Sequence, residues 1–290
     1  MLSKQPYMYM KKKLLEEKIF KVIMVSAAII ILTVLLYIIG TVLYKGLPSL
    51  SWDMITKLPG GGFYLGKEGG VLNAIVGSVY IILGALALSL VISVPLVMYI
   101  NFYLPPNSKF SKVIRFSLDI LFGIPSIVYG AFGFALMIYL GIRASLLGGI
   151  ITVGMLIMPI MMRSFDEIAR LLSRELPDAL LSLGATKYEM TKVIMRQLMP
   201  GLMTAILLAV GRGIGDAATV LFTAGYTDNI PVSLNQPAAT LPLAIFFQLG
   251  SPVVEVQNRA YASAVILTVL ILVLSFSARY FSSKFSKNKI

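Results

Sequence analysis

The sequence contains no cysteine and no histidine, and it is poor in charged residues. These absences exclude disulfides and metal sites built from thiolates or imidazoles, and they remove the commonest general base. Only 13% of the 290 residues are charged, whereas 58% are hydrophobic. A soluble domain of this size cannot cover so much apolar surface, so the sequence predicts an all-α, polytopic membrane helical bundle.

The charge that is present has one dominant sign, with a formal net charge of +12. In a soluble protein this excess would suggest nucleic acid as a partner. In a membrane protein the simpler explanation is that Lys and Arg gather at the cytoplasmic ends of the spans. We therefore expect a lipid bilayer as the partner and no nucleic acid.

Six stretches are long and apolar enough to cross a bilayer, because about 20 such residues span the hydrocarbon. They lie at residues 22–44, 74–104, 115–141, 144–162, 200–225 and 260–278. The first follows a basic run, but it is longer than the apolar region of a signal peptide and no small-residue cleavage site follows it. It is expected to be a retained span. Asp119 interrupts the third, and Arg115, four residues earlier, is its expected partner.

One further apolar stretch, residues 229–254, contains four prolines at 231, 237, 242 and 252. A continuous lipid-exposed helix cannot accommodate them easily, because the backbone groups that lose a hydrogen bond at each proline find no other hydrogen-bond partner in lipid. The stretch is predicted to lie in an outer loop, residues 226–259, with a short helix against the bundle.

Six spans with both termini in the cytoplasm place most of the 25 Lys and Arg residues on inner segments, whereas a seventh would put a basic tail outside. The predicted organisation is a cytoplasmic segment at 1–21, a single transmembrane domain at 22–281 and a basic cytoplasmic tail at 282–290.

Residues 163–199 form the one sizeable polar segment. It is predicted to fold as a helix from Arg163 to Leu176, a break at Pro177 and a second helix from Asp178, interrupted at Gly184. A solvated loop is one interpretation. Apolar positions within the segment favour a docking surface instead; they are Ala179, Leu180, Leu181, Leu183 and Ala185.

The spacing of Asp178-Ala179-Leu180, Gly184 and Ile194 resembles the loop motif of ABC-importer permeases, usually Glu-Ala-Ala, three residues, Gly, nine residues, Ile. Residues 123–130, 183–188 and 221–224 are similar to the phosphate-importer permeases of this family, as are 46–48 and 236–242. The resemblance covers roughly residues 40 to 280 and is closest to the A-type subunit. The sequence departs from the motif in having Asp178 for Glu, Leu180 for the second Ala, and Arg196-Gln197 for a Leu-Pro pair.

The resemblance implies the type I ABC-importer permease fold and a non-catalytic subunit in a bacterial or archaeal plasma membrane. The implied partners are a paralogous C-type permease, a dimer of ATPase subunits and an external phosphate-binding protein. No cofactor is expected in this chain, because ATP would bind to the ATPase subunits. Six residues would couple the chain to the ATPase: Asp178, Ala179, Leu180, Gly184, Ala185 and Thr186.

Arg212 and Asp216 lie four residues apart within the fifth predicted span, so both are expected on one helix face. An intramembrane Arg costs about 2.5–3.5 kcal/mol on insertion scales and should face the bundle interior beside a partner. A structural ion pair is one interpretation. The other is that Arg212 meets a phosphate oxyanion with its forked donors, and that Asp216 holds it when the site is empty. By resemblance, Arg163 would line the inner mouth, although a snorkelling anchor is the simpler explanation.

The predicted function is thus half of the pore of an ATP-driven phosphate importer. A permease for sulfate or molybdate is an alternative, because Arg accepts several tetrahedral oxyanions. An ion-coupled secondary transporter would need inverted repeats or a set of relay carboxylates, and the sequence shows one acid pair and no convincing repeat. The sequence contains no phosphate-binding loop of the G-x-x-x-x-G-K-[ST] type, and no nucleophile–base or metal constellation supports an enzyme.

Overall fold

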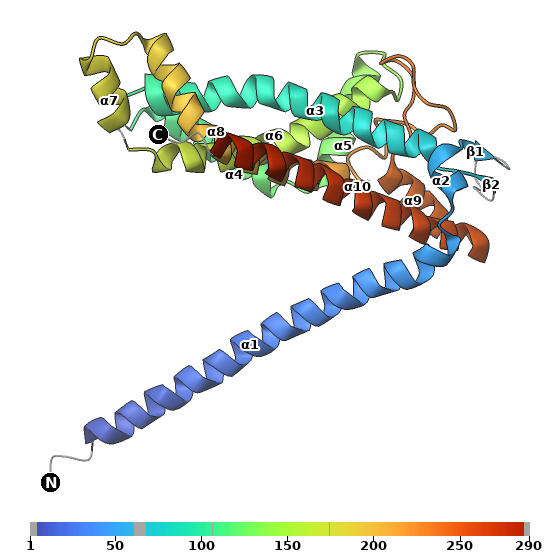
Figure 1. Cartoon of the computed structure of the whole chain (residues 1–290), viewed down its shortest axis with the longest axis horizontal. Coiled ribbons are helices and arrows are strands. Elements are labelled where there is room, and N and C mark those ends of the chain that lie inside the picture. Colours follow the sequence, from blue (N-terminus) through green and yellow to red (C-terminus); the bar gives the residue numbers. More distant parts are fainter. Residues whose placement is uncertain (1–4, 61–67, 106, 174, 287–290) are drawn as a thin grey trace.

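The computed structural model describes residues 5–60, 68–105, 107–173 and 175–286. These residues form a helical bundle with a single long helix leaving it (Figure 1). The one sheet in this part of the chain is an antiparallel pair of short strands, β1 (Pro59–Gly60) and β2 (Glu68–Gly69). The helices of more than one turn are α1 (Gln5–Gly46), α2 (Trp52–Thr56), α3 (Leu72–Met98), α4 (Lys109–Gly123), α5 (Ser126–Tyr139), α6 (Leu146–Leu171), α7 (Glu175–Ser182), α8 (Lys187–Ile214), α9 (Leu241–Leu249) and α10 (Val254–Ser286). A 3-10 turn (Leu47–Ser49) follows α1, and a π-helical turn, η2 (Tyr99–Tyr103), extends α3.

Five helices are long and apolar enough to cross a membrane, and the number is six if the bent pair α4 and α5 counts as one span. The prediction of a continuous third span at 115–141 was wrong, because the two helices meet at a 102° bend. The cause is Pro125, which disfavours helical dihedrals at the residue before it. Ile124 accordingly has an extended backbone, with ψ 129°.

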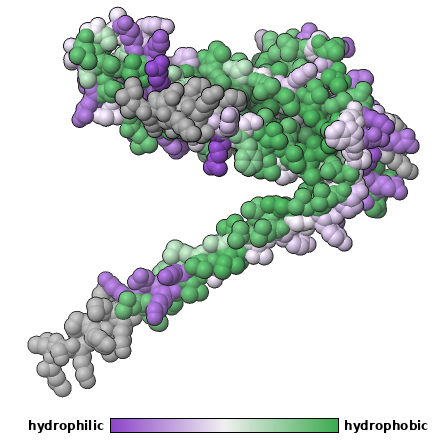
Figure 2. Space-filling model, in the orientation of Figure 1, coloured by the Kyte–Doolittle hydropathy of each residue, from purple (hydrophilic) through white to green (hydrophobic). Residues whose placement is uncertain are grey.

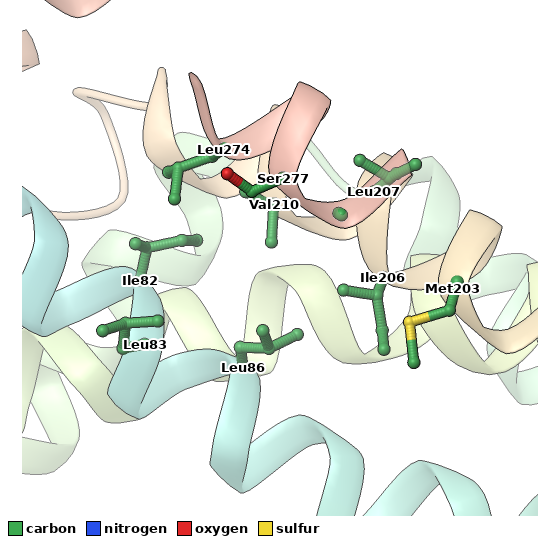
Figure 3. A pocket seen from close by; sticks show the side chains of 10 residues that line it. Ile82, Leu83, Leu86, Met203, Ile206, Leu207, Val210, Leu274 and Ser277 are labelled. Atoms are coloured by element: carbon green, nitrogen blue, oxygen red, sulfur yellow. The ribbon is translucent and has the colours of Figure 1, made fainter. Parts of the chain in front are cut away.

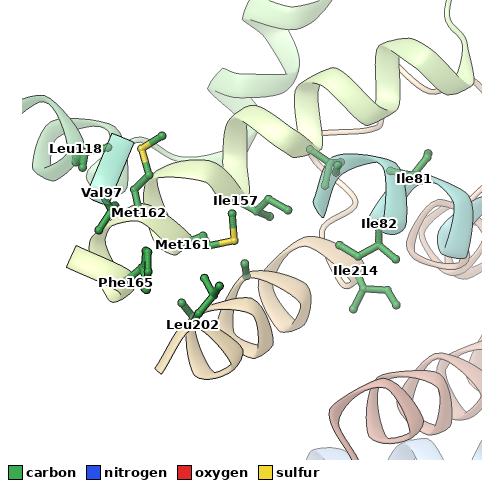
Figure 4. Close-up of a cluster of buried hydrophobic side chains, with 14 of the residues drawn as sticks. Ile81, Ile82, Val97, Leu118, Ile157, Met161, Met162, Phe165, Leu202 and Ile214 are labelled. Carbon is green, nitrogen blue, oxygen red and sulfur yellow. The ribbon is translucent and has the colours of Figure 1, made fainter. Parts of the chain in front are cut away.

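The hydrophobic core lies where α6 packs between α3 and α8. Ile157, Met161 and Phe165 project from one face of α6 and are completely buried (Figure 4). Gly154 on the same helix brings α6 close to α3, since a Cβ there would lie 3.0 Å from a methyl of Leu88. The central part of the fold is therefore a three-helix layer with close backbone contacts.

The fifth predicted span was placed too late in the sequence. Its helix, α8, begins at Lys187, runs through Pro200 and ends at Ile214, so residues 215–225 are not helical. Glycines at 211, 213 and 215 explain the early end, because glycine weakens a helix and tolerates a change of direction. Asp216 therefore lies beyond the helix that carries Arg212.

The inner polar segment also divides differently from the prediction. Helix α6 continues to Leu171, and the break falls after it instead of at Pro177. Pro177 lies in the first turn of α7, where its missing N–H is not needed. The predicted restart after Gly184 is confirmed: the Thr186 side chain accepts a hydrogen bond from the Glu189 N–H, and the Glu189 carboxylate accepts one from the Thr186 N–H. This reciprocal capping box begins α8.

The proline-rich stretch contains the short helix α9, as predicted, and irregular backbone before it. The last span is longer than predicted, because α10 runs from Val254 to Ser286. The proposed tail at 282–290 therefore begins as helix, and its residues 287–290 lie outside the described part of the chain. Likewise, residues 5–21 of the proposed N-terminal segment are the beginning of α1, and residues 1–4 are not described.

Helix α1 contacts the bundle only through its C-terminal end, where it meets α10 and then diverges from it (Figure 1). Gly46 makes the close approach, because a Cβ there would lie 2.6 Å from the Tyr261 carbonyl oxygen. Side chains 13–40 of α1 are all exposed. Hydrophobic residues cover much of α1 and the middle of the bundle surface, and hydrophilic residues gather toward the ends (Figure 2).

Candidate functional site

The predicted pair of Arg212 and Asp216 is present, although it is not a pair on one helix face. Arg212 lies in the last turn of α8, and Asp216 begins the turn segment of residues 216–224 that follows. The backbone at Gly215 keeps right-handed helical dihedrals, with φ −93° and ψ −2°, and Arg212 Nη2 lies 3.6 Å from Asp216 Oδ2. This is an ion pair at longer than hydrogen-bond distance.

The two partners have very different surroundings. The side chain of Asp216 is 3% exposed, and its Oδ1 accepts a hydrogen bond from the Thr219 N–H at 2.8 Å. The space beside it, lined in part by Ser78 and Thr240, is only about 10 Å³, which is at most enough for one water molecule. Asp216 is therefore a fixed internal anchor, and an anion cannot pass on its buried side.

Arg212, in contrast, faces outward, with 53% of its side chain exposed. Within the described residues its guanidinium makes no hydrogen bond, so its donors are available. A half-exposed Arg on the surface of a membrane bundle is costly unless it faces water or another polar surface. The Arg212 guanidinium is thus held in place by the buried Asp216 carboxylate, and it lies on a surface that no other part of the described chain covers.

Polar groups continue from Asp216 into the bundle. The Thr219 hydroxyl donates to the Ser126 carbonyl oxygen at 3.3 Å, which joins the turn segment to the start of α5. One turn later, Thr223 shares a 2.9 Å hydrogen bond with Thr152 of α6. These contacts fix the turn segment between α5 and α6.

Gly130, the last residue of the 123–130 motif, explains why that motif belongs to the site. A Cβ at this position would lie 2.7 Å from the Ala218 carbonyl oxygen and 3.0 Å from that of Thr219. The glycine therefore allows α5 to contact the backbone of the turn segment directly.

Replacing Gly130 with valine is expected to displace the turn segment and to lower transport by about tenfold or more, because overpacking against backbone costs about 1–3 kcal/mol. The measurement is uptake by membrane vesicles at matched amounts of protein. Gly123→Val is the control, since a Cβ at Gly123 meets nothing within 4 Å. Equal uptake by the two variants would contradict the role of Gly130.

Arg163 is not part of this site. It lies on α6 toward the loop end, about 12 Å from the helix C-terminus at 1.5 Å per residue, whereas Arg212 lies about 38 Å from the start of α8. Its guanidinium pairs with Asp119 of α4 and lies 3.4 Å from Glu167 Oε1, and it also stands 5.4 Å from the centre of the Phe122 ring. Arg163 therefore ties α6 to α4 just before the bend.

The expected local pair of Arg115 and Asp119 was wrong. Arg115 instead makes a two-point contact with Asp166 of α6, from Nε to Oδ2 at 2.8 Å and from Nη2 to Oδ1 at 3.0 Å. Asn101 completes the cluster by donating to Asp166 and accepting from Arg115. The sequence analysis did not predict this cluster. The available signal was Asp166, a carboxylate in a helix that continues directly from the span predicted at 144–162.

The predicted coupling residues lie together at the opposite end of the bundle from Arg212. Four are exposed, namely Asp178, Ala179, Gly184 and Thr186, and Leu180 and Ala185 are half-buried. Helix α7 ends in a double hydrogen bond, from the Ala185 N–H to the Leu180 carbonyl and from the Gly184 N–H to the Leu181 carbonyl. This Schellman arrangement needs a left-handed residue, and Gly184 supplies it with φ +83°. Leu183 is 85% exposed beside it, so the end of α7 presents apolar surface to solvent.

A larger cavity of about 460 Å³ lies between α3, α8 and α10 (Figure 3). Its lining is apolar apart from Ser277, with Ile82, Ile206 and Leu274 as representative residues. An oxyanion entering it would lose its hydration without gaining donors. The cavity is thus unsuited to an anion, and Arg212 remains the candidate site.

Comparison with known proteins agrees with this fold. Residues 93–287 match the family model described as "Binding-protein-dependent transport system inner membrane component". A chain in a crystal structure of the MetNI methionine ABC transporter in an inward-facing conformation has the same fold, with a TM-score of 0.61 at 17% identity, covering 74% of this chain and 95% of that chain.

Curated relatives are similar over most of their length. "Phosphate transport system permease protein PstA" of Pasteurella multocida is 32% identical over 258 residues, which is 87% of this chain and 89% of the relative. The protein of the same name from Xylella fastidiosa strain Temecula1 is 35% identical over 244 residues, or 82% and 83%. The chain belongs to the family of inner membrane components of binding-protein-dependent transport systems.

Proposed function

We propose that this chain is the A-type permease subunit of an ATP-driven importer of inorganic phosphate, located in a bacterial inner membrane with both termini in the cytoplasm. The observation that carries the proposal is Arg212, whose unoccupied donors face out of the bundle while Asp216 fixes it from inside. A guanidinium remains charged at all relevant pH values and presents paired donors to tetrahedral oxygens. The names of the relatives from Pasteurella and Xylella support phosphate as the anion.

This chain would form only half of the pore. The space beside Asp216 is too small for an anion, so the path must run along the exposed side of Arg212, where a second subunit would close it. Helix α1 supports the same conclusion, since it projects from the bundle with every side chain from 13 to 40 exposed. A paralogous C-type permease with a matching surface is the proposed second half.

The energy would come from a separate pair of ATPase subunits, which hold the ATP. The end of α7 is the proposed contact, because it combines exposed apolar side chains with a rigid turn at Gly184. An external binding protein would deliver phosphate to the opposite face. The chain itself is non-catalytic.

Two experiments test this proposal. Affinity purification of the tagged chain from native membranes should recover an ATPase and a second permease. Proteoliposomes containing that complex and its binding protein should accumulate radiolabelled phosphate when ATP is supplied to the cytoplasmic face. Excess unlabelled sulfate or molybdate should not compete.

Competition by sulfate or molybdate at equal concentration would identify the chain as a permease for a related oxyanion. Recovery of neither an ATPase nor a second permease, together with uptake that needs no ATP, would contradict the proposal and favour a secondary transporter.

A further inference from the structure

The end of α3 changes its helical form. Residues Tyr99–Tyr103 make a π-helical turn, η2, and the backbone of Leu104 then becomes extended. Such turns are rare, and they occur frequently at functional sites. Two side chains of η2, Asn101 and Tyr103, contact different parts of the molecule, and neither contact was used in the proposed function.

Asn101 fastens η2 to α4 and α6. Its amide nitrogen donates to Asp166 Oδ1 at 2.7 Å, and its carbonyl oxygen accepts from Arg115 Nη2 at 2.9 Å. Since Asp166 has a side chain only 7% exposed and is held by the two-point contact with Arg115, every member of the cluster has a partner. Separating such a cluster would leave a buried charge unpaired, so the three helical segments are expected to move together.

Tyr103 fastens the same turn to the beginning of α8. Its hydroxyl lies 2.6 Å from Thr191 Oγ1 and 3.3 Å from the Lys187 carbonyl oxygen. Lys187 follows directly after Thr186 and the capping box, which continue from the Gly184 turn. The hydroxyl contact is neutral and exposed, so it is weaker than the buried cluster. The Lys187 ammonium also lies 5.8 Å from the centre of the Tyr103 ring, a contact that phenylalanine at position 103 would keep.

The cluster and the Tyr103 contact therefore differ in strength, and both act on η2. On one side, α4 leads from Arg115 to the bend before α5, where Ser126 meets Thr219 of the turn segment that holds Asp216. On the other side, α8 begins directly after the proposed ATPase contact at the end of α7 and carries Arg212 in its last turn. We propose that η2 is a positioning element that makes α4 follow the beginning of α8, with the Tyr103 hydroxyl as the connection between them. This inference rests on the proposed function and extends it to named residues.

Tyr99 offers a matched control within the same turn. Its ring lies 6.2 Å from that of Tyr103 in a stacked arrangement. Across the described residues, however, the Tyr99 hydroxyl makes no hydrogen bond. Tyr99→Phe and Tyr103→Phe thus remove the same atom from the same turn, and only the second removes a connection to α8.

The first measurement is the number of ATP molecules hydrolysed per phosphate imported by the purified complex in proteoliposomes. Tyr103→Phe and Thr191→Val are each expected to raise this ratio by about threefold, and the double variant should be no worse than either alone. Tyr99→Phe should keep the parental ratio. A parental ratio in Tyr103→Phe would overturn the inference, even if the parental complex imports phosphate as proposed.

The second measurement does not depend on the transported solute. Because the chain has no cysteine, spin labels can be attached at Ser117→Cys on α4 and Lys192→Cys on α8, two exposed positions. In an otherwise parental complex their separation should have one narrow distribution, with and without trapped nucleotide. Tyr103→Phe should broaden it or make it depend on nucleotide, and Tyr99→Phe should not.

A distribution in Tyr103→Phe that is narrow and does not change with nucleotide, or one in the parental complex that is broad or changes with nucleotide, would overturn the positioning role. If the parental complex fails to import phosphate, the proposed function is wrong, and the label distances still decide whether η2 connects α4 to α8.

Discussion

Replacing Arg212 with alanine is expected to reduce phosphate uptake by about a hundredfold, while the complex still assembles. Two charge-assisted hydrogen bonds to a phosphate are together worth several kcal/mol in a poorly hydrated pore, and alanine offers none. Lysine should restore only part of the uptake, because it supplies a charge without the forked donors. The measurement is initial uptake of radiolabelled phosphate at equal amounts of complex.

The same substitution leaves Asp216 buried without its counter-charge, which could by itself disturb folding. The double variant Arg212→Ala with Asp216→Asn removes this problem, since the amide oxygen can still accept from the Thr219 N–H. It should assemble normally and still fail to transport. Arg279→Ala, at an exposed position on α10, controls for the loss of one positive charge. Uptake within twofold of the parental rate in either Arg212 variant would remove this residue from the mechanism.

Replacing Gly184 with leucine is expected to uncouple ATP hydrolysis from transport. A left-handed backbone costs a leucine about 1–2 kcal/mol, and relief of that strain would unwind the double hydrogen bond at the end of α7. Because a Cβ at this position meets nothing within 4 Å, the effect comes from the backbone and not from a clash. Phosphate imported per ATP should fall by about tenfold, while hydrolysis continues.

Gly141 provides the matched control. It also has a positive φ, +68°, and open space around its Cβ position, but it lies in the turn between α5 and α6. Gly141→Leu should carry the same backbone strain and retain normal coupling. If both leucine variants lower the phosphate-to-ATP ratio equally, general destabilisation explains the result and the docking role of Gly184 is wrong.

The sequence predicted the features that depend on a few residues in a row. Charge-free runs located four of the six predicted spans, four prolines located the irregular outer segment, and the spacing from Asp178 to Ile194 indicated the family. Arg212 and Asp216 were paired correctly. The reason given was only half right, because the helix ends at Ile214 and Asp216 lies in the turn segment beyond it, although Gly215 keeps right-handed helical dihedrals.

The errors share a physical cause. Local spacing favoured Arg115 with Asp119, but folding gave Arg115 to Asp166, which is 51 residues away and better buried. The 102° bend is made at a single proline, Pro125, and the π-helical turn at Tyr99 lies where η2 packs against α6. A hydropathy pattern is averaged over a whole span. It therefore does not show where a helix bends at one residue, nor which carboxylate forms an ion pair with a residue distant in the sequence.

The exposed helix α1 has a consequence for how the protein must be made. Residues 13–40 find almost no partner in their own chain, so a chain without the proposed second subunit would leave them exposed in the bilayer. A chain produced in excess would keep the side chains of this helix unmatched and would be open to attack by membrane proteases. If the proposed second permease covers α1, the lifetime of this chain is therefore expected to depend on how much of that second permease the cell synthesises.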